Sequence, residues 1–178
     1  AEAPIEMEGM AIGAPELSPD GNRVALVINS QQGTDIWSYE LARGTLSRIT
    51  FSNTAHSPLW SPDGERIVYS TPTGPESINA SGIGAIEKLL STAPPDAGGI
   101  FFPTTITPDS RDILAYVGGG RARAIYRINQ TPERTTIAPL LDSEGYAETA
   151  PALSPDGRWL AYVSRETGQD EVYVRPYP

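Results

Sequence analysis

Short stretches of alternating apolar and polar residues recur along the chain and are separated by turn residues. Asp35–Leu41 alternates over most of its length, and Arg23–Ile28 is rich in residues that favour strands. A period of two is typical of half-buried β-strands. One segment is ambiguous, because the spacing in Ile83–Leu90 also suits a helical turn. Its place in the repeat described below favours a strand at Ile86–Leu90, and the pattern as a whole predicts an all-β fold.

A four-residue motif, Ser-Pro-Asp-Gly, separates the predicted strands at regular intervals. It begins at Ser18, Ser61 and Ser154, and a variant, Thr-Pro-Asp-Ser, begins at Thr107, so the copies are 43, 46 and 47 residues apart. Proline presets φ for a turn, aspartate bonds nearby amides, and glycine adopts the left-handed conformation that returns the chain to a strand. The motif therefore predicts hairpin turns. Its four aspartates could alternatively bind a metal, but turn chemistry already explains proline, aspartate and glycine together.

The third copy of the motif departs from the others, because Ser110 stands where the other copies have glycine. A left-handed residue other than glycine costs about 1 kcal/mol. We therefore expect this turn to have changed type.

A repeat of 40–50 residues with four short strands is typical of a β-propeller blade. The last repeat has only three predicted strands, and we expect Ile5–Ile12 at the N-terminus to complete it; the alternative is that this segment is a loose tail. The predicted fold is an all-β propeller of about four four-stranded antiparallel blades. Their expected bounds are 14–51, 57–91, 101–141 and 150–178, the last together with 5–12.

Several stretches resemble a known repeat. Residues 150–164, Ala-Pro-Ala-Leu-Ser-Pro-Asp-Gly-Arg-Trp-Leu-Ala-Tyr-Val-Ser, resemble the TolB-like or WD-like β-propeller repeat, and residues 35–44 and 57–64 fit the same group. Together with Glu-Val-Tyr-Val-Arg-Pro-Tyr-Pro at 171–178, the chain is most similar to the C-terminal propeller of bacterial receptor-type serine/threonine protein kinases.

This resemblance implies a non-catalytic module that binds a ligand or a protein, such as an extracytoplasmic sensor. It favours a periplasmic or other extracytoplasmic location, and a cytoplasmic one stays open. The same repeat occurs in prolyl-oligopeptidase-type enzymes, so the alternative is an accessory propeller that gates substrate access to a peptidase. Full propellers of this group usually have six or more blades. A chain with about four is therefore expected to be a fragment, or to pair with a second copy as a homodimer that completes a larger ring.

Charge and composition exclude several other classes of function. The chain has 22 acidic and 13 basic residues and a formal net charge of −9, which opposes nucleic-acid partners and anionic membrane surfaces. No apolar run approaches the roughly 20 residues that span a bilayer, so membrane insertion is not expected. The chain has no cysteine and one histidine, His56, and lacks a G-x-S-x-G motif. We predict no catalytic residue, no metal site and no cofactor.

The best candidate for a binding site is one mouth of the propeller channel. His56 lies just before the first strand of the second repeat, which should be innermost, so its loop should open onto that mouth. Polar and acidic residues in the equivalent loops or strands would surround it, and the mouth could then bind a cation, a basic peptide or another small ligand. The alternative is that these are solvated loop residues. The other candidates are Glu16, Asn53, Glu144 and Glu148.

Overall fold

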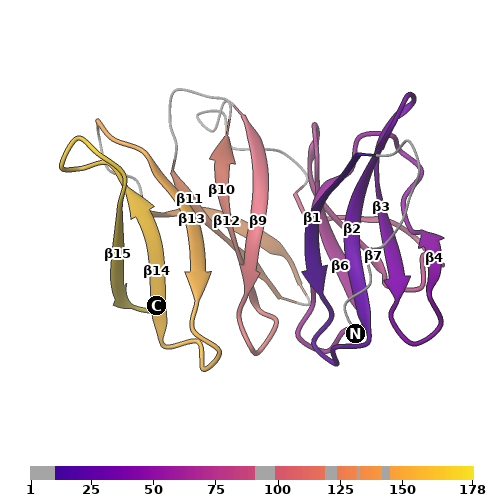
Figure 1. Cartoon of the computed structure of the whole chain (residues 1–178). Helices are drawn as coiled ribbons and strands as arrows, with labels where there is room; N and C mark the ends of the chain where they lie inside the picture. The colour runs from indigo at the N-terminus through magenta and orange to yellow at the C-terminus, as the bar shows by residue number, and fades with distance from the viewer. Residues whose placement is uncertain (1–10, 91–98, 119–123, 132, 142–144) are drawn as a thin grey trace.

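The computed structural model describes residues 11–90, 99–118, 124–131, 133–141 and 145–178, and the elements assigned within these ranges are all β-strands. They form four antiparallel sheets that follow one another along the chain (Figure 1). The first sheet contains β1 (Ala11–Leu17), β2 (Arg23–Ser30), β3 (Gly33–Glu40) and β4 (Thr45–Arg48). The second contains β5 (His56–Trp60), β6 (Arg66–Thr71), β7 (Gly74–Asn79) and β8 (Glu87–Lys88).

The third sheet contains β9 (Ile100–Ile106), β10 (Asp112–Gly118), β11 (Ile125–Gln130) and β12 (Thr135–Leu141). The fourth contains β13 (Glu148–Leu153), β14 (Trp159–Ser164) and β15 (Glu171–Pro176), and it has three strands within the described residues. In each sheet the strands are ordered as in the sequence, which is the arrangement of a propeller blade. The prediction of an all-β propeller with four blades is confirmed.

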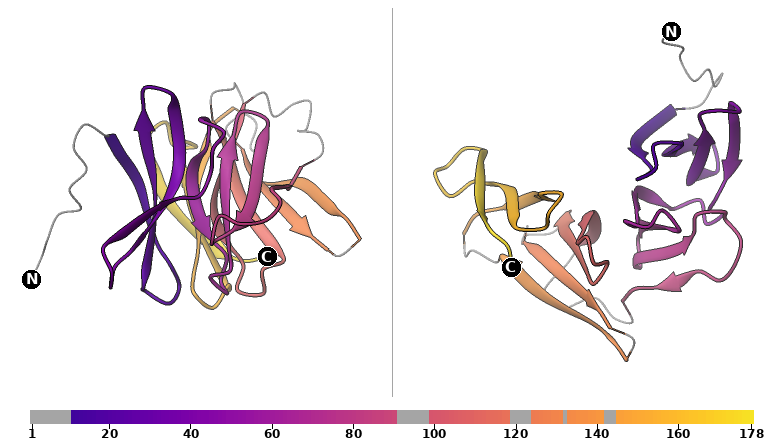
Figure 2. Two further views of the ribbon diagram at one scale, coloured as in Figure 1. Left: turned by 90° about the vertical axis from the view of Figure 1, so that its right-hand side faces the viewer. Right: turned by 90° about the horizontal axis from the view of Figure 1, so that it is seen from below.

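The blades stand side by side in an open arc (Figure 2). Their first strands, β1, β5, β9 and β13, lie on the concave side, and the later strands of each blade lie farther out. Each of the strands β5, β9 and β13 contacts the blade before it. The first and fourth blades lie at the two ends of the arc and not side by side (Figure 2).

Apolar layers between neighbouring blades hold the arc together. Between the first and second blades, Ala25 and Ile36 pack with Trp60 and Ile67, all at most 4% exposed. Equivalent layers lie between the second and third blades and between the third and fourth blades. Large buried side chains of this kind contribute roughly 1.5–3 kcal/mol each through removal from water. Strand alternation supplies them, because every second residue of β2 or β3 faces the next blade.

The Ser-Pro-Asp-Gly turns have one geometry in all four blades. In the first, the Ser18 hydroxyl donates to Asp20 Oδ1 (2.5 Å) and accepts from the Arg23 amide (2.9 Å), while the Gly21 amide donates to the Ser18 carbonyl. In the third, Thr107 makes the same bonds to Asp109, and Ser110 takes the place of glycine at φ 59°. The expected change of turn type is therefore wrong: the threonine hydroxyl and aspartate bonds hold serine in the left-handed conformation.

Two expectations about strands have different outcomes. The second blade does end in a strand, although β8 contains only Glu87 and Lys88. Ala11 and Ile12, which were expected in the strand completing the last blade, instead begin β1 of the first blade and pair with Asn29 and Ile28. They extend the β1–β2 ladder without interruption as far as Gly13, which explains their placement. The remainder of that segment, residues 5–10, lies outside the described residues.

Candidate functional site

The residues at one end of the blades are nearly the same in all four repeats, whereas those at the other end differ from blade to blade. One end, called here the turn end, holds the four turns beginning at Ser18, Ser61, Thr107 and Ser154. The opposite end, called the start end, is where β1, β5, β9 and β13 begin. There the strand register makes four residues equivalent, because each pairs with the same position of the second strand: Gly13 with Val27, His56 with Ser70, Phe102 with Tyr116 and Thr149 with Val163.

A bulge in each innermost strand separates the start end from the turn end. The register shifts between Gly13 and Glu16 in β1, and the other three innermost strands have equivalent shifts. The residue before proline is left-handed in three of them: Ala14 at φ 46°, Ser57 at φ 48° and Ala150 at φ 51°. Proline at the following position disfavours the right-handed helical region for these residues. The bulge bends each strand and re-aims the side chains at its beginning.

His56 is half-buried at the start end. Thr34 Oγ1 lies 3.3 Å from both ring nitrogens of His56, so the hydroxyl can bond either one depending on the tautomer. The backbone of Thr34 also binds the loop before β5, since its amide donates to the Asn53 carbonyl and its carbonyl accepts from the Ala55 amide. These two backbone bonds therefore fix the loop that carries His56.

Phe102, equivalent to His56 in the third blade, was not among the predicted site residues. Its ring stacks on Tyr116 with 5.2 Å between centroids and an interplanar angle of 20°. Gly118 allows this position, because a Cβ atom there would lie 2.7 Å from Phe102 Cε2. The sequence could have indicated Phe102, because it occupies the same position in the third repeat as His56 does in the second. The start end thus combines a histidine with a fixed, partly exposed aromatic pair.

Glu148 begins β13 and is 3% exposed. It pairs with Ser164 in the ladder, one position before Thr149. Burial, and then the nearby Glu148 carboxylate, raise the pKa of Tyr162 above its ordinary value. Glu148 therefore lies at the start end as His56 does, but in the fourth blade, with the third blade between them. Glu144 lies outside the described residues.

Glu16 and Asn53, the remaining predicted site residues that the structure describes, do not lie at the first positions of the innermost strands as His56 and Glu148 do. Glu16 lies on the turn side of the bulge in β1, where burial raises the pKa of its carboxyl, and its carbonyl accepts a hydrogen bond from Trp60 Nε1 (3.0 Å). Asn53 precedes β5, adopts φ 58°, and is bound into a polar cluster. The structure thus brings Asn53 and His56 together through Thr34, and separates Glu16 from both.

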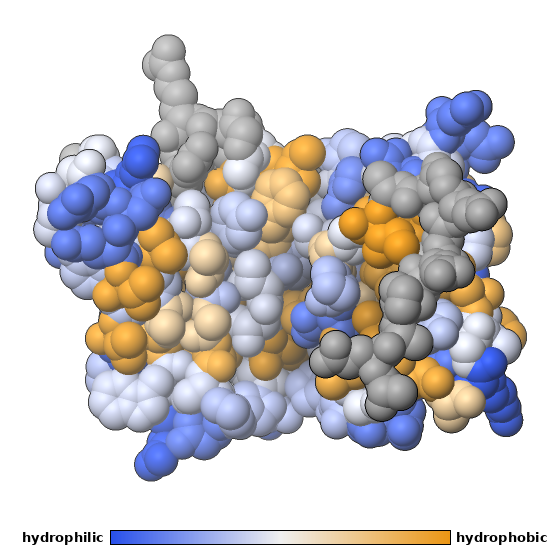
Figure 3. All heavy atoms as spheres, in the orientation of Figure 1, coloured by the Kyte–Doolittle hydropathy of each residue, from blue (hydrophilic) through white to orange (hydrophobic). Residues whose placement is uncertain are grey.

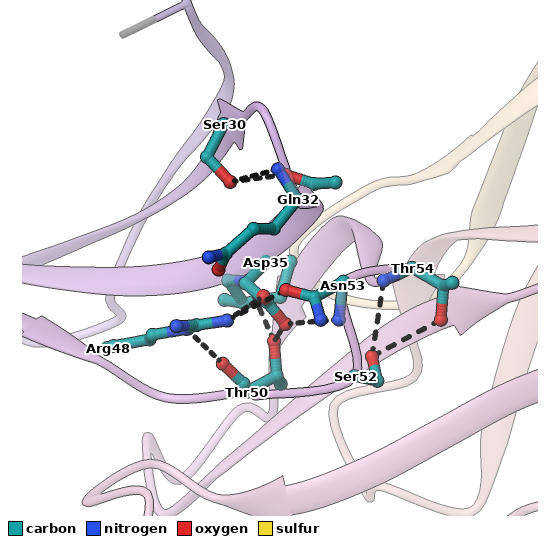
Figure 4. Close-up of polar contacts among 10 residues, drawn as sticks. Ser30, Gln32, Asp35, Arg48, Thr50, Ser52, Asn53 and Thr54 are labelled. Atoms are coloured by element: carbon teal, nitrogen blue, oxygen red, sulfur yellow. Dashed lines mark hydrogen bonds and ion pairs between the residues drawn. The ribbon is translucent and has the colours of Figure 1, made fainter.

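The polar cluster around Asn53 is centred on the buried Asp35 (Figure 4). Arg48 Nη2 contacts Asp35 Oδ2 at 2.5 Å and also donates to Asn53 Oδ1 (3.0 Å). The other oxygen of Asp35 accepts from the Thr50 hydroxyl (2.8 Å) and the Asn53 amide (3.2 Å). These bonds connect β3, the end of β4 and the loop into the second blade, and so they position the loop that carries His56.

Among the described residues, cavities lie at the turn end, between neighbouring blades. The one between the second and third blades has a volume of about 300 Å³ and is lined by Asp63, Arg66 and Ser110, among others. The one between the third and fourth blades has about 370 Å³ and includes Asp112 and Tyr177, whose hydroxyl donates to Asp112 Oδ2 (2.9 Å). Within the described ranges, no three histidine, aspartate or glutamate side chains are grouped so as to hold a metal ion.

Comparison with solved structures identifies the fold. No protein-family model matches the chain. TolB from Acinetobacter baumannii superposes with a TM-score of 0.79 at 21% identity, over 97% of this chain and 42% of that chain. The extracellular domain of a candidate one-component system from B. thetaiotaomicron has a TM-score of 0.65 at 16% identity, over 97% of this chain and 22% of that one. A puromycin-hydrolyzing peptidase from Mycobacterium tuberculosis has a TM-score of 0.65 at 14% identity, over 98% of this chain and 31% of that one.

These likenesses show that the chain has the fold of TolB-like propeller blades. It spans less than half the length of each of these three proteins. No helix among the described residues is long and apolar enough to cross a membrane.

Proposed function

We propose that the chain is a non-catalytic binding module and that its ligand, a protein segment or a small molecule, contacts the start end. The observation that carries the proposal is the contrast between the two ends. The turn end repeats one hydrogen-bonded turn four times, as the fold requires. The start end has glycine, histidine, phenylalanine and threonine at four equivalent positions, which the fold does not require.

The ligand should be neutral or cationic. The chain has a formal net charge of −9, which favours cationic over anionic partners. At the start end, the half-buried ring of His56 supplies hydrogen-bonding capacity, and the Phe102–Tyr116 pair supplies an apolar surface at the equivalent position of the next blade. An apolar surface with a few fixed polar groups is the usual chemistry of a ligand site. A segment with lysine or arginine fits both the charge and the aromatic pair.

A finer assignment is an extracytoplasmic sensor or interaction domain, as in the receptor-type kinases that the sequence resembles. The likeness to an extracellular domain of a one-component system supports it. The alternative is an accessory propeller of a prolyl-oligopeptidase-type peptidase, which the likeness to the mycobacterial peptidase supports. The coding sequence on either side distinguishes the two: a kinase domain and a membrane helix favour the sensor, and a hydrolase domain favours the peptidase.

The binding proposal is tested with three pools of fluorescently labelled decapeptides, enriched in lysine and arginine, in neutral residues, or in acidic residues. We expect fluorescence anisotropy to rise with the basic pool, and His56→Ala and Phe102→Ala each to weaken that binding. Glu65→Gln is the control, because it removes an acidic charge at the turn end, where Glu65 is exposed. Equal binding by wild type and both start-end variants would overturn this site, and preference for the acidic pool would overturn the charge argument.

A further inference from the structure

The fourth blade has an apolar face that no part of the described chain covers. Val163 pairs with Val172, and Ala161 pairs with Val174, so these four side chains lie on one face together with Trp159. Val172 is 73% exposed, Val174 63% and Trp159 49%. Figure 3 shows the corresponding apolar surface at the end of the molecule where β14 and β15 lie. We call Trp159, Ala161, Val163, Val172 and Val174 the fourth-blade face.

The same face is covered in every earlier blade. The residues equivalent to Val172 are Ile36, Pro75 and Ile125, and all three are buried. In each case the first strand of the next blade lies against that face: β5 on the first blade, β9 on the second and β13 on the third. The fourth-blade face therefore has the chemistry of an interface between blades, which takes an innermost strand of this same repeat.

One such strand in the chain is also uncovered, and it is β1. It has the bulge and the left-handed residue before proline that β5 and β13 have. Leu17 in β1 is equivalent to Trp60 in β5, since they pair with Val24 and Ile67 respectively. Trp60 is 4% exposed in its contact with the first blade, whereas Leu17 is 58% exposed and Ile12 is 42% exposed. We call Ile12 and Leu17 the first-blade edge.

We propose that the fourth-blade face binds the first-blade edge of a second copy of this chain, as β5 binds the first blade within one copy. The two surfaces lie at opposite ends of the arc, so the contact is head to tail (Figure 2). Two contacts of this kind join two copies into a ring of eight blades. Exposed contiguous apolar patches are uncommon on soluble monomers and mark interaction sites.

The test is the mass of the purified chain by light scattering after size-exclusion chromatography, over a wide range of concentration. Because the net charge of −9 repels a second copy, the buffer should contain about 0.15 M salt, which reduces the Debye length to about 8 Å. We expect a mass of two chains. A mass of one chain at every concentration would overturn the proposal.

Variants test the head-to-tail geometry. Val174→Asp changes the face and Leu17→Asp changes the edge, and each should weaken self-association by at least about tenfold, because each places a charge in an apolar contact. Ile83→Asp is the matched control, since Ile83 is 78% exposed but lies outside both surfaces. Thermal unfolding shows that each variant is folded.

Mixing provides the sharper readout. Leu17→Asp retains an intact face and Val174→Asp retains an intact edge, so a mixture should form one intact contact and associate better than either variant alone. Association of Leu17→Asp at the wild-type level, or no gain on mixing, would overturn the head-to-tail contact. Neither result depends on a ligand at the start end, so failure here is separate from failure of the binding proposal.

Discussion

The first and fourth blades contain the same three-strand pattern but differ in what covers them. Ile36 in the first blade is fully buried, whereas the equivalent Val172 in the fourth is 73% exposed. Asp35 is 3% exposed and bound by Arg48, Thr50 and Asn53. Its equivalent, Glu171, accepts hydrogen bonds from Thr167 and from Tyr173 at the surface.

The Ile36 and Val172 pair shows that the face of a blade is buried only when its neighbour is present. The burial of Asp35 depends instead on Arg48 at the end of β4 and on the loop into the second blade. Alternation along β2 and β3 places apolar residues on the face toward the second blade, and β5 then removes them from water. The fourth blade has the alternation without the neighbour. Substitutions at equivalent positions should therefore have unequal effects on the free energy of unfolding, measured by urea denaturation of dilute protein.

The largest inequality should be at the Ile36 and Val172 pair. Ile36→Ala removes a fully buried side chain and should lower the free energy of unfolding by about 4 kcal/mol, through lost burial and a remaining cavity. At a dilution where the chain is a monomer, Val172→Ala should change it by less than about 0.5 kcal/mol, because the side chain is then in water. A cost for Val172→Ala that approaches the cost for Ile36→Ala would show that the fourth-blade face is covered in solution.

The next inequality should be at the Asp35 and Glu171 pair. Asp35→Asn leaves the Arg48 guanidinium without its buried counter-charge and should cost about 3 kcal/mol, near the lower limit for a buried pair because Arg48 is partly exposed. Glu171→Gln should cost less than about 0.5 kcal/mol. The double variant Asp35→Asn with Arg48→Gln should lose less than the sum of the single variants. Additive losses would mean that the two charges do not interact.

The repeat was predictable because its turns are local. Ser18, Pro19, Asp20 and Gly21 bond only to one another and to the two residues that follow, so four consecutive residues carry the whole signal. This was enough to count the blades and to identify their innermost strands. It was not enough to predict that the third turn keeps its type with Ser110 in place of glycine. The left-handed conformation there depends on hydrogen bonds that Thr107 and Asp109 preserve.

The candidate site was less predictable because it depends on contacts between distant segments. The role of Asn53 requires Asp35 and Arg48, which come from two different strands. A charged residue at Asp35, inside an alternating strand, was the available signal for a buried ion pair. Its partner 13 residues later depends on the β3–β4 register, which alternation alone leaves undetermined.

At the turns, a substitution should lower the free energy of unfolding more in the fourth blade than in the first, which is the reverse of the order above. Gly21 has φ 70° and open space where a Cβ atom would lie, so Gly21→Ser should cost about 1 kcal/mol for the left-handed conformation alone. Gly157 has φ 68°, and a Cβ atom there would lie 3.0 Å from Pro108 Cδ of the third-blade turn. Gly157→Ser should therefore cost more than Gly21→Ser. Equal costs would show that the two neighbouring turns move apart freely.

The smallest effect should be a difference in how salt changes the pKa values of the turn aspartates in the first and fourth blades, Asp20 and Asp156. Hydrogen bonds from Ser18 and Asn22 lower the pKa of Asp20 to about 2, whereas Ser154 and then Arg158 lower the pKa of Asp156 to about 2. Because both values lie below the unfolded value near 3.9, the stabilisation is complete above that pH and is lost as the pH falls toward 2. One molar salt shortens the Debye length to about 3 Å. It should therefore raise the pKa of Asp156, whose ion pair with Arg158 is exposed, more than that of Asp20.

Carboxyl ¹³C NMR titrations at low and high salt measure both pKa values in one sample. Arg158→Gln should remove the extra salt response of Asp156 and leave Asp20 unchanged, because Asp20 depends mainly on the neutral Ser18 and Asn22. An equal salt response at both aspartates would show that the Arg158 charge contributes nothing, and that the two turns are held by the same neutral hydrogen bonds. The first and fourth blades would then be alike at the turn end.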